Sequence, residues 1–193
     1  GILQFGVPLP RFGTALGSGF LVHPDGYVLT AEHVIASSRK IKVVLFKAGG
    51  PEGDPKGETY DAEVIGRKKE AGVAILKIKP TSPLPVLPLG DSSKLEIGDH
   101  VVAVGNPYGF SHTVTSGIVS FIGRKLPESG SRGKDIAFIQ IDAPINPGNS
   151  GGGLFDLRGR LVGIPTSIFG PISGNVGIGF AVPSDNAMSV LNQ

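Results

Sequence analysis

The chain has 193 residues, a formal net charge of +2 and no cysteine. Without cysteine it cannot contain disulfides, a thiol nucleophile or thiolate metal sites. No apolar stretch approaches the ~20 residues that a membrane-spanning helix needs, so no transmembrane segment is expected. The four histidines lack metal-ligand spacing, and no basic stripe with interleaved aromatic residues indicates nucleic acid as a partner.

The first candidate residue follows a turn at residues 24–26. Apolar residues 27–29 predict a strand, and His33 lies in a short segment of small residues where that strand ends. A neutral imidazole there can take a proton from a serine and later return it to a leaving amine. A lone histidine is more often a surface residue or a satisfied core residue, and the other three histidines keep that interpretation. His33 is therefore a candidate base only in combination with a nucleophile.

Short apolar runs separated by turns continue along the chain. They occupy residues 42–46, 101–104, 138–141 and 161–164. Together with 30 glycines and 16 prolines, this spacing predicts an all-β protein with a sandwich or barrel architecture. The exception is residues 185–193, where the pattern predicts a short C-terminal helix capped by Ser184. At this length the chain is one domain or two closely packed halves.

Residues 146–153 read Asn-Pro-Gly-Asn-Ser-Gly-Gly-Gly and carry the strongest functional signal. The glycines permit positive φ and let a substrate backbone approach closely, while successive N–H groups converge on one point. The pattern predicts that Ser150 is a nucleophile. The N–H groups of Gly148 and Ser150 would form an oxyanion hole, with Asn149 helping to shape it. The alternative is a glycine-rich turn whose serine bonds its own backbone.

Ordered motif blocks cover roughly residues 15–190. They include Gly-Ser-Gly-Phe-Leu-Val at 17–22, Thr-Ala-Glu-His-Val at 30–34, Val-Ala-Ile-Leu-Lys-Ile at 73–78, Gly-Asn-Pro-Tyr-Gly at 105–109 and Asn-Pro-Gly-Asn-Ser-Gly-Gly at 146–152. In this order the blocks resemble an HtrA/Deg-type, trypsin-like serine protease domain. The resemblance implies a single protease domain with a chymotrypsin-like double six-stranded β-barrel. The N-terminal barrel would cover about residues 1–95 and the C-terminal barrel residues 96–193.

The resemblance also implies a function. It predicts a serine endopeptidase that cleaves unfolded or misfolded polypeptides through an acyl-enzyme, without metal or cofactor. Such proteins serve protein quality control outside the cytoplasm, for example in the periplasm. They commonly form homotrimers through N-terminal aromatic residues, a role open to Phe5 and Phe12, which could equally be core residues. Many carry a C-terminal PDZ domain, but none is expected within residues 1–193. Because the chain begins with Gly1 and shows no signal peptide, we expect a processed or excised fragment.

One position departs from the family pattern. The third triad member is an aspartate directly before the apolar run that here begins at Val73, and this chain has Gly72 there. Glycine cannot orient an imidazole, and loss of the acid costs on the order of 10⁴ in kcat. Three explanations are open. The glycine is engineered, or it is natural and leaves a weak or inactive enzyme, or another carboxylate takes over the function of the missing aspartate. Glu70 would lie about 7 Å from position 72 on an extended segment. Glu32 adjoins His33, but neighbouring side chains of an extended chain point apart.

The resemblance further assigns a substrate site. Pro144, six residues before the nucleophile, would lie at the base of the pocket for the substrate's P1 side chain. Ile164 would help line this pocket, which implies small aliphatic P1 residues. Extended substrate backbone is expected to add as a strand to the segment Ile164, Pro165, Thr166 and Ser167. Pro165 is unexpected there because it removes one N–H donor.

Two further hypotheses remain open. The chain could be a catalytically silent protease-fold module that binds extended polypeptide or a partner by strand addition. Gly72 supports that alternative, whereas the presence of both His33 and Ser150 argues against it. Residues 126–134, which contain Pro127 and Gly130, are expected to be mobile and to take part in switching between inactive and active arrangements.

Overall fold

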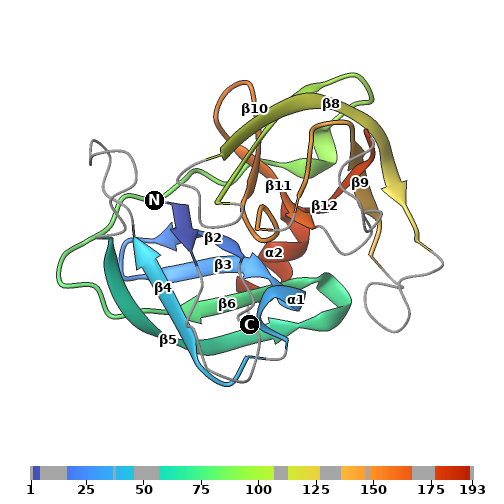
Figure 1. Ribbon diagram of the computed structural model, residues 1–193. Helices are drawn as coiled ribbons and strands as arrows, with labels where there is room; N and C mark the ends of the chain where they lie inside the picture. Colours follow the sequence, from blue (N-terminus) through green and yellow to red (C-terminus); the bar gives the residue numbers. More distant parts are fainter. Residues whose placement is uncertain are drawn as a thin grey trace.

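The computed structural model describes residues 2–4, 17–36, 38–45, 57–106, 113–126, 136–146, 148–166 and 177–191. In these residues the chain forms two closed barrels of six strands each, one above the other in Figure 1. The predicted all-β, chymotrypsin-like double barrel with a short C-terminal helix is confirmed. Within the described ranges, no helix is long and apolar enough to cross a membrane. Phe5, Phe12, Ser167 and residues 127–134 lie outside the described residues.

The N-terminal barrel consists of β1 (Ile2–Gln4), β2 (Ser18–His23), β3 (Tyr27–Ala31), β4 (Ile41–Leu45), β5 (Glu58–Lys68) and β6 (Val73–Lys77), in the order β1-β2-β3-β6-β5-β4. Strand β4 shows the alternation expected of a barrel strand with one face toward the interior. Its alternate residues Ile41, Val43 and Leu45 are buried, while the residues between them are partly exposed. Two single turns interrupt the strands, α1 (Glu32–Ile35) after β3 and the 3-10 turn η1 (Lys69–Ala71) before β6.

The C-terminal barrel consists of β7 (His100–Gly105), β8 (Thr113–Arg124), β9 (Phe138–Ile141), β10 (Gly153–Asp156), β11 (Leu161–Thr166) and β12 (Gly179–Pro183), in the order β10-β11-β12-β9-β8-β7. The link between the barrels contains the 3-10 turn η2 (Ser92–Lys94). The apolar runs predicted as strands correspond to β4, β7, β9 and β11. All six residues of β11 are buried, because this strand lies between the core of its own barrel and the neighbouring barrel.

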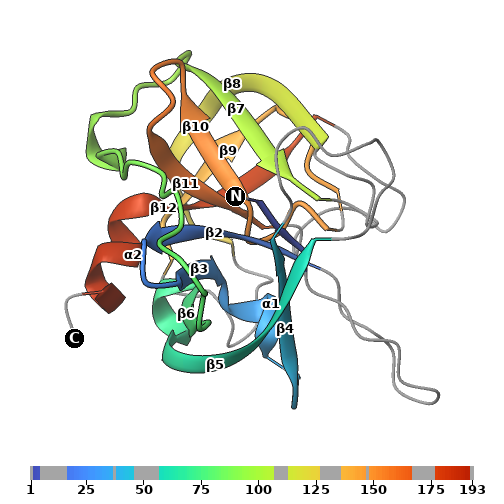
Figure 2. The same ribbon diagram turned by 90° about the vertical axis from the view of Figure 1, so that its left-hand side faces the viewer.

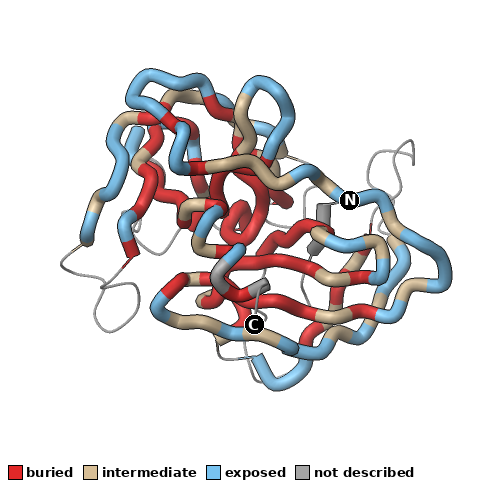
Figure 3. Tube along the Cα trace, turned by 180° about the vertical axis from the view of Figure 1, so that it is seen from behind, coloured by how far each residue is buried: buried red, intermediate tan, exposed pale blue. Residues whose placement is uncertain are grey.

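The larger of two hydrophobic clusters joins the barrels. It combines residues of the N-terminal barrel, such as Phe20 and Leu29, with Phe138, Phe180 and Val182 of the C-terminal barrel. The rings of Phe138 and Phe180 meet edge to face with centroids 6.2 Å apart. Figure 3 shows buried residues in both barrels and where the two barrels meet. The barrels therefore share a core, and their junction is fixed by apolar packing.

Helix α2 (Ser184–Leu191) leaves β12 and packs against β6 of the other barrel (Figure 2). The helix begins at Ser184 itself, one residue earlier than expected, and the Ser184 hydroxyl donates to the carbonyl of Gly90 at 3.2 Å. Capping comes instead from Ser92. Its hydroxyl accepts the N–H of Asp185 at 3.1 Å, and its own N–H donates to Asp185 Oδ1 at 3.2 Å. A contact across the link between the barrels thus satisfies an N–H of the first turn.

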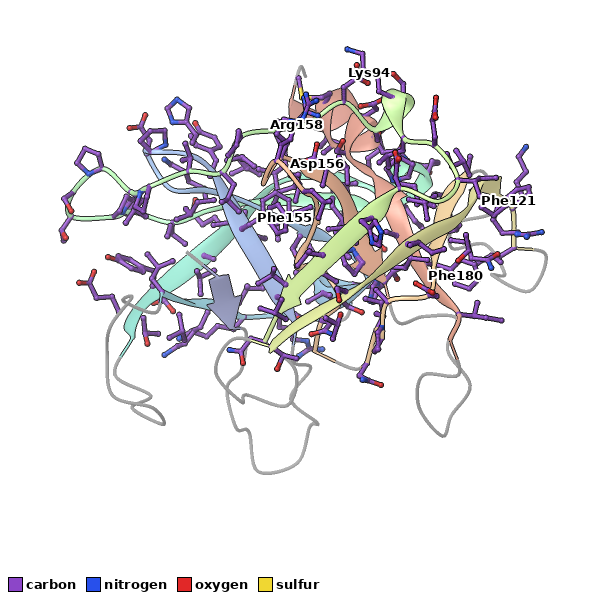
Figure 4. All side chains as sticks on the ribbon, turned by 90° about the horizontal axis from the view of Figure 1, so that it is seen from above. Lys94, Phe121, Phe155, Asp156, Arg158 and Phe180 are labelled. Carbon is purple, nitrogen blue, oxygen red and sulfur yellow. The ribbon has the colours of Figure 1, made fainter. Side chains whose placement is uncertain are left out.

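Asp156 stabilises the turn between β10 and β11. Its Oδ1 accepts the N–H groups of Arg158 and Arg160, each at 2.9 Å, and its Oδ2 accepts from Arg160 Nε at 2.8 Å. Figure 4 shows Asp156 and Arg158 next to each other at this turn. Partial burial opposes ionisation, but the hydrogen bonds from Arg160 and Arg158 outweigh it and lower the pKa of Asp156 below its ordinary value.

Candidate active site

His33 lies at the junction of the two barrels. Strand β3 ends at Ala31, and α1 then turns the chain, so the segment around His33 is helical rather than extended. The residue is partly buried. Its Nδ1 lies 3.4 Å from the hydroxyl oxygen of Thr166, at the end of β11 in the opposite barrel. The histidine of one barrel therefore contacts β11 of the other, the second strand after the serine loop.

Ser150 lies in a tight turn that precedes β10. The N–H of Asn149 donates to the carbonyl of Asn146 and the N–H of Gly152 donates to the carbonyl of Asn149, both at 3.0 Å. Gly151 has φ +83°, and a Cβ at that position would lie 2.2 Å from the carbonyl oxygen of Ser18. Only glycine fits such a conformation and such a close approach. The glycine next to the serine is thus required by the backbone path.

Strand β11 brings these two elements together. The N–H of Gly151, which follows Ser150, donates to the carbonyl of Pro165 at 2.9 Å. The next residue, Thr166, approaches His33. The serine loop and His33 are thereby attached to neighbouring residues of β11, the loop through Gly151 at Pro165 and the histidine at Thr166, although Ser150 and His33 are 117 positions apart in the sequence.

Gly72 lies beside the helix that carries His33. Ala31 pairs with Val73, and the N–H of Glu32 donates to the carbonyl of Gly72 at 2.9 Å. Gly72 ends η1 in the left-handed conformation, with φ +71°. A Cβ here would lie 2.7 Å from Ile136 Cδ1 and 3.0 Å from Val182 Cγ2. The backbone at position 72 therefore lies next to the helix of His33, as expected for the acid position. A side chain at position 72, however, would point toward the apolar side chains of Ile136 and Val182.

This geometry can be compared with known proteins. Residues 17–164 match the trypsin-like peptidase domain. The chain belongs to this family. The predicted family resemblance is confirmed on 148 matched residues, which extend from the start of β2 into β11 and include both His33 and Ser150.

Relatives of this trypsin-like peptidase are of the HtrA/Deg type. A probable periplasmic DegP-like serine endoprotease of Pseudomonas fluorescens is 46% identical over 196 residues, which cover 97% of this chain and 38% of the relative. The putative serine protease HhoA of Synechocystis is 44% identical over 186 residues, covering 96% and 44%. The solved structure of the HtrA-type protease AlgW with a tripeptide superposes with a TM-score of 0.84 at 38% identity, covering 99% of this chain and 58% of that one. The chain thus spans less than half the length of these curated relatives.

Two carboxylates lie close to His33 or Gly72 in the sequence. Glu32 is buried, and its Oε1 accepts from Arg67 Nε at 2.6 Å and also contacts Arg67 Nη2. Its charge is therefore compensated by Arg67. Glu70 is exposed in the turn η1, so the expectation of an extended segment at Glu70 is wrong.

The predicted substrate segment divides between core and surface. Pro144 is exposed, and its carbonyl accepts from Thr115 Oγ1 at 2.9 Å. Ile164 is completely buried in the cluster that joins the barrels, and its role as a pocket lining stays a prediction. Pro165 pairs with Ala181 in the sheet. Its carbonyl accepts the N–H of Gly151, a bond that the missing N–H of proline does not affect.

Sequence reasoning missed two contacts of this candidate site. Thr166 was expected only as a substrate-binding residue, yet it is the described neighbour of His33 Nδ1. Ser18 was quoted only as part of a motif, yet it is fully buried against the serine turn. Both contacts cross between the barrels, so no local sequence pattern could have indicated them. In the described part of the chain, no group of three or more His, Asp or Glu side chains could hold a metal ion.

Proposed function

We propose that this chain is the protease domain of an HtrA-type serine endopeptidase that hydrolyses unfolded or misfolded polypeptides. The observation that carries the proposal is that His33 contacts Thr166 while Gly151, the residue after Ser150, bonds the adjacent Pro165. The names of the relatives, which are serine endoproteases and HtrA-type proteases, support it. The single protease domain would combine an N-terminal half of about residues 1–95 with a C-terminal half of residues 96–193.

In this mechanism the Ser150 hydroxyl attacks the carbonyl carbon of a peptide bond. His33 accepts the serine proton and then donates it to the leaving amine. The N–H groups of Gly148 and Ser150 stabilise the oxyanion of the tetrahedral intermediate, and Asn149 shapes the loop that carries them. Water then hydrolyses the acyl-enzyme. These steps require neither a metal nor a cofactor.

Thr166 takes the place next to His33 Nδ1 that an acid would otherwise occupy. A hydroxyl oxygen can accept the Nδ1 proton and so hold the tautomer whose other nitrogen is a base. It carries no charge, and therefore it cannot stabilise the imidazolium as a carboxylate does. With Gly72 at the acid position, we expect a slow enzyme, weakened by up to about 10⁴ in kcat relative to a complete triad.

The substrate would bind as an extended strand along Pro165, Thr166 and Ser167. Pro144 would contribute to a P1 pocket that prefers small aliphatic residues, with the buried Ile164 supporting it from the core. By analogy with relatives named as periplasmic, we propose an extracytoplasmic location and a role in protein quality control. A homotrimer is part of the same proposal.

A second candidate is a silent module that binds extended polypeptide without cleaving it. The observation that favours it is the glycine at position 72, which leaves His33 without an acid from that position. Chemistry at Ser150 separates the two candidates, because a binding module needs no reactive serine.

The test is casein cleavage together with covalent labelling by a fluorophosphonate. We expect slow cleavage and labelling by the parent chain, and neither by Ser150→Ala or His33→Ala. Ser184→Ala, which removes an equally buried hydroxyl, and His100→Ala, on an exposed position, are the matched controls. If the parent binds casein without cleaving it and is not labelled, the silent module is correct and the endopeptidase proposal fails.

A further inference from the structure

Three consecutive peptide units around Ser150 are each anchored through their carbonyl oxygen. The carbonyl of Gly148 accepts from the Ser18 hydroxyl at 2.6 Å. The carbonyl of Asn149 accepts from the N–H of Gly152 at 3.0 Å, and the carbonyl of Ser150 accepts from the N–H of Ser18 at 2.8 Å. One residue of the N-terminal barrel thus holds two of the three units.

These anchors determine the direction of the N–H groups. In a planar trans peptide the C=O and the N–H of one unit point in opposite directions. The N–H of Ser150 belongs to the unit whose carbonyl bonds Gly152, so it points away from Gly152. The two flanking units cannot rotate without breaking a bond to Ser18. Their N–H groups, on Asn149 and Gly151, are bonded as well, to Asn146 at 3.0 Å and Pro165 at 2.9 Å.

Ser18 is itself held rigidly. The residue is completely buried, and its hydroxyl accepts the N–H of Asn106 at 2.8 Å while donating to Gly148. Its carbonyl accepts from the Thr30 hydroxyl at 2.7 Å, and Thr30 is also completely buried. The donor and acceptor capacity of the Ser18 side chain is therefore used in one fixed geometry. Such a network loses its geometry when one member is removed.

We propose that Ser18 is the positioning residue of the oxyanion loop: from the N-terminal barrel it fixes the peptide units that aim the Ser150 N–H. This inference rests on the proposed function, since the oxyanion hole has a task only in a peptidase. It does not make Ser18 a catalytic residue, because Ser18 contacts the loop and not the substrate. The loop therefore depends on both barrels: its residues belong to the C-terminal barrel, and Ser18, which bonds it, belongs to the N-terminal barrel.

The consequence concerns turnover rather than substrate binding. Ser18→Ala keeps the N–H bond to Ser150 but leaves the Gly148 carbonyl and the Asn106 N–H without their partner. The first of the three units is then held only through the bond from the Asn149 N–H to the carbonyl of Asn146. Removal of one oxyanion donor costs roughly 10²–10³ in kcat. Loss of the Ser18–Gly148 bond only changes the direction of the Ser150 N–H, so kcat should fall less, roughly 10- to 100-fold, with KM nearly unchanged.

The experiment compares the parent with Ser18→Ala and Ser92→Ala. Ser92 is a matched control because it is also a buried serine whose hydroxyl accepts a backbone N–H, in this case at helix α2. Three quantities are measured for each: Tm, kcat and KM on a fluorogenic peptide, and the ¹H–¹⁵N signals and exchange rates of the Gly148 and Ser150 amides. Ser18→Cys, which nearly keeps the volume but is a weak donor, replaces Ser18→Ala if the alanine variant does not fold.

We expect both serine variants to lose stability, but only the Ser18 variant to lose kcat and to shift the Gly148 and Ser150 amide signals. If those amides are unchanged and the kcat loss does not exceed that of Ser92→Ala, the inference is overturned. If the parent shows no cleavage but the amides shift in the Ser18 variant, the proposed function fails while the positioning of the loop by Ser18 stands. If the parent cleaves and the Ser18 variant cleaves equally well, the function stands and the inference fails.

Discussion

Replacing Gly72 with aspartate asks whether a missing carboxylate limits this site. If the new carboxylate reaches Nδ1 of His33, kcat is expected to rise by roughly 10³–10⁴, the factor lost when a triad aspartate is removed. At about 1.36 kcal/mol for each tenfold change, this corresponds to roughly 4–5.5 kcal/mol of transition-state stabilisation. The carbonyl of Gly72 bonds the N–H of Glu32 at 2.9 Å, so the substituted residue lies directly beside the helix that carries His33.

The structure also sets a cost for this substitution. Position 72 has φ +71° and ψ 18°, and a left-handed conformation costs an L-residue roughly 1–2 kcal/mol, less for aspartate than for most. The new Cβ would lie 2.7 Å from Ile136 Cδ1 and 3.0 Å from Val182 Cγ2. The first contact involves the end of a flexible side chain, which can rotate. At roughly 2–4 °C per kcal/mol for a chain of this length, we expect Tm to fall by roughly 2–8 °C.

The assay measures casein and peptide cleavage alongside thermal unfolding. Gly72→Ala is the control, since it introduces the same strain and contact without a carboxylate. Gly72→Asp combined with Ile136→Val removes the methyl group that lies closest to the new Cβ. If both aspartate variants stay folded and cleave no faster than Gly72→Ala, position 72 does not limit the enzyme and the reasoning is refuted. If the parent already cleaves rapidly, another group serves His33.

Two other predictions follow from single contacts. Thr166→Val should lower kcat roughly tenfold and change the ¹⁵N shifts of the His33 ring, because a valine cannot accept the Nδ1 proton, whereas Thr166→Ser should keep both. Unchanged ring shifts in the valine variant would contradict this role of Thr166. For Asp156, the folded pKa is below its ordinary value of 3.8, so its contribution to stability is full above that value and is lost as pH falls through the lowered folded pKa. Asp156→Asn should therefore lower the free energy of unfolding by about 1 kcal/mol at neutral pH and by progressively less under acidic conditions, measured by urea unfolding; an equal loss at pH 2 and pH 7 would contradict it.

Much of the fold could be predicted because the signals are local. Alternating or continuous apolar runs bounded by turns identify strands directly, and β4 shows the expected alternate burial. The serine loop could be located for a similar reason, since Gly151 must be glycine to fit against Ser18. The start of helix α2 was placed within one residue. Its cap was not, because Ser92 reaches it from a different part of the chain.

The remaining features depend on contacts between distant segments. No sequence pattern shows that Arg67 pairs with the buried Glu32, so the sequence could argue against Glu32 as the acid only from side-chain directions in an extended chain, whereas Glu32 lies in the helical turn α1. The burial of Ile164 follows from the contact of β11 with the other barrel, which a strand pattern alone cannot distinguish from a pocket wall. The conformation of η1 also depends on tertiary packing, and an extended reading of Glu70 was therefore wrong.

The packing around Gly72 bears on why the glycine is there. Truncation of an aspartate would leave unfilled volume and polar groups that had bonded the carboxylate. Here Ile136 and Val182 already fill the space that a side chain at position 72 would enter. Among described residues, the buried side-chain atoms without a hydrogen-bond partner belong to Asn106 and Asn149, on the side of the serine loop.

This packing favours a glycine that is integral to the chain over one left by removal of an acid. It also sharpens the central prediction, because a carboxylate at position 72 must compete with an apolar neighbour for its space. We therefore expect Gly72→Asp with Ile136→Val to cleave faster than Gly72→Asp alone. Equal rates for the two variants would mean that Ile136 yields freely and that its contact does not decide the state of the site.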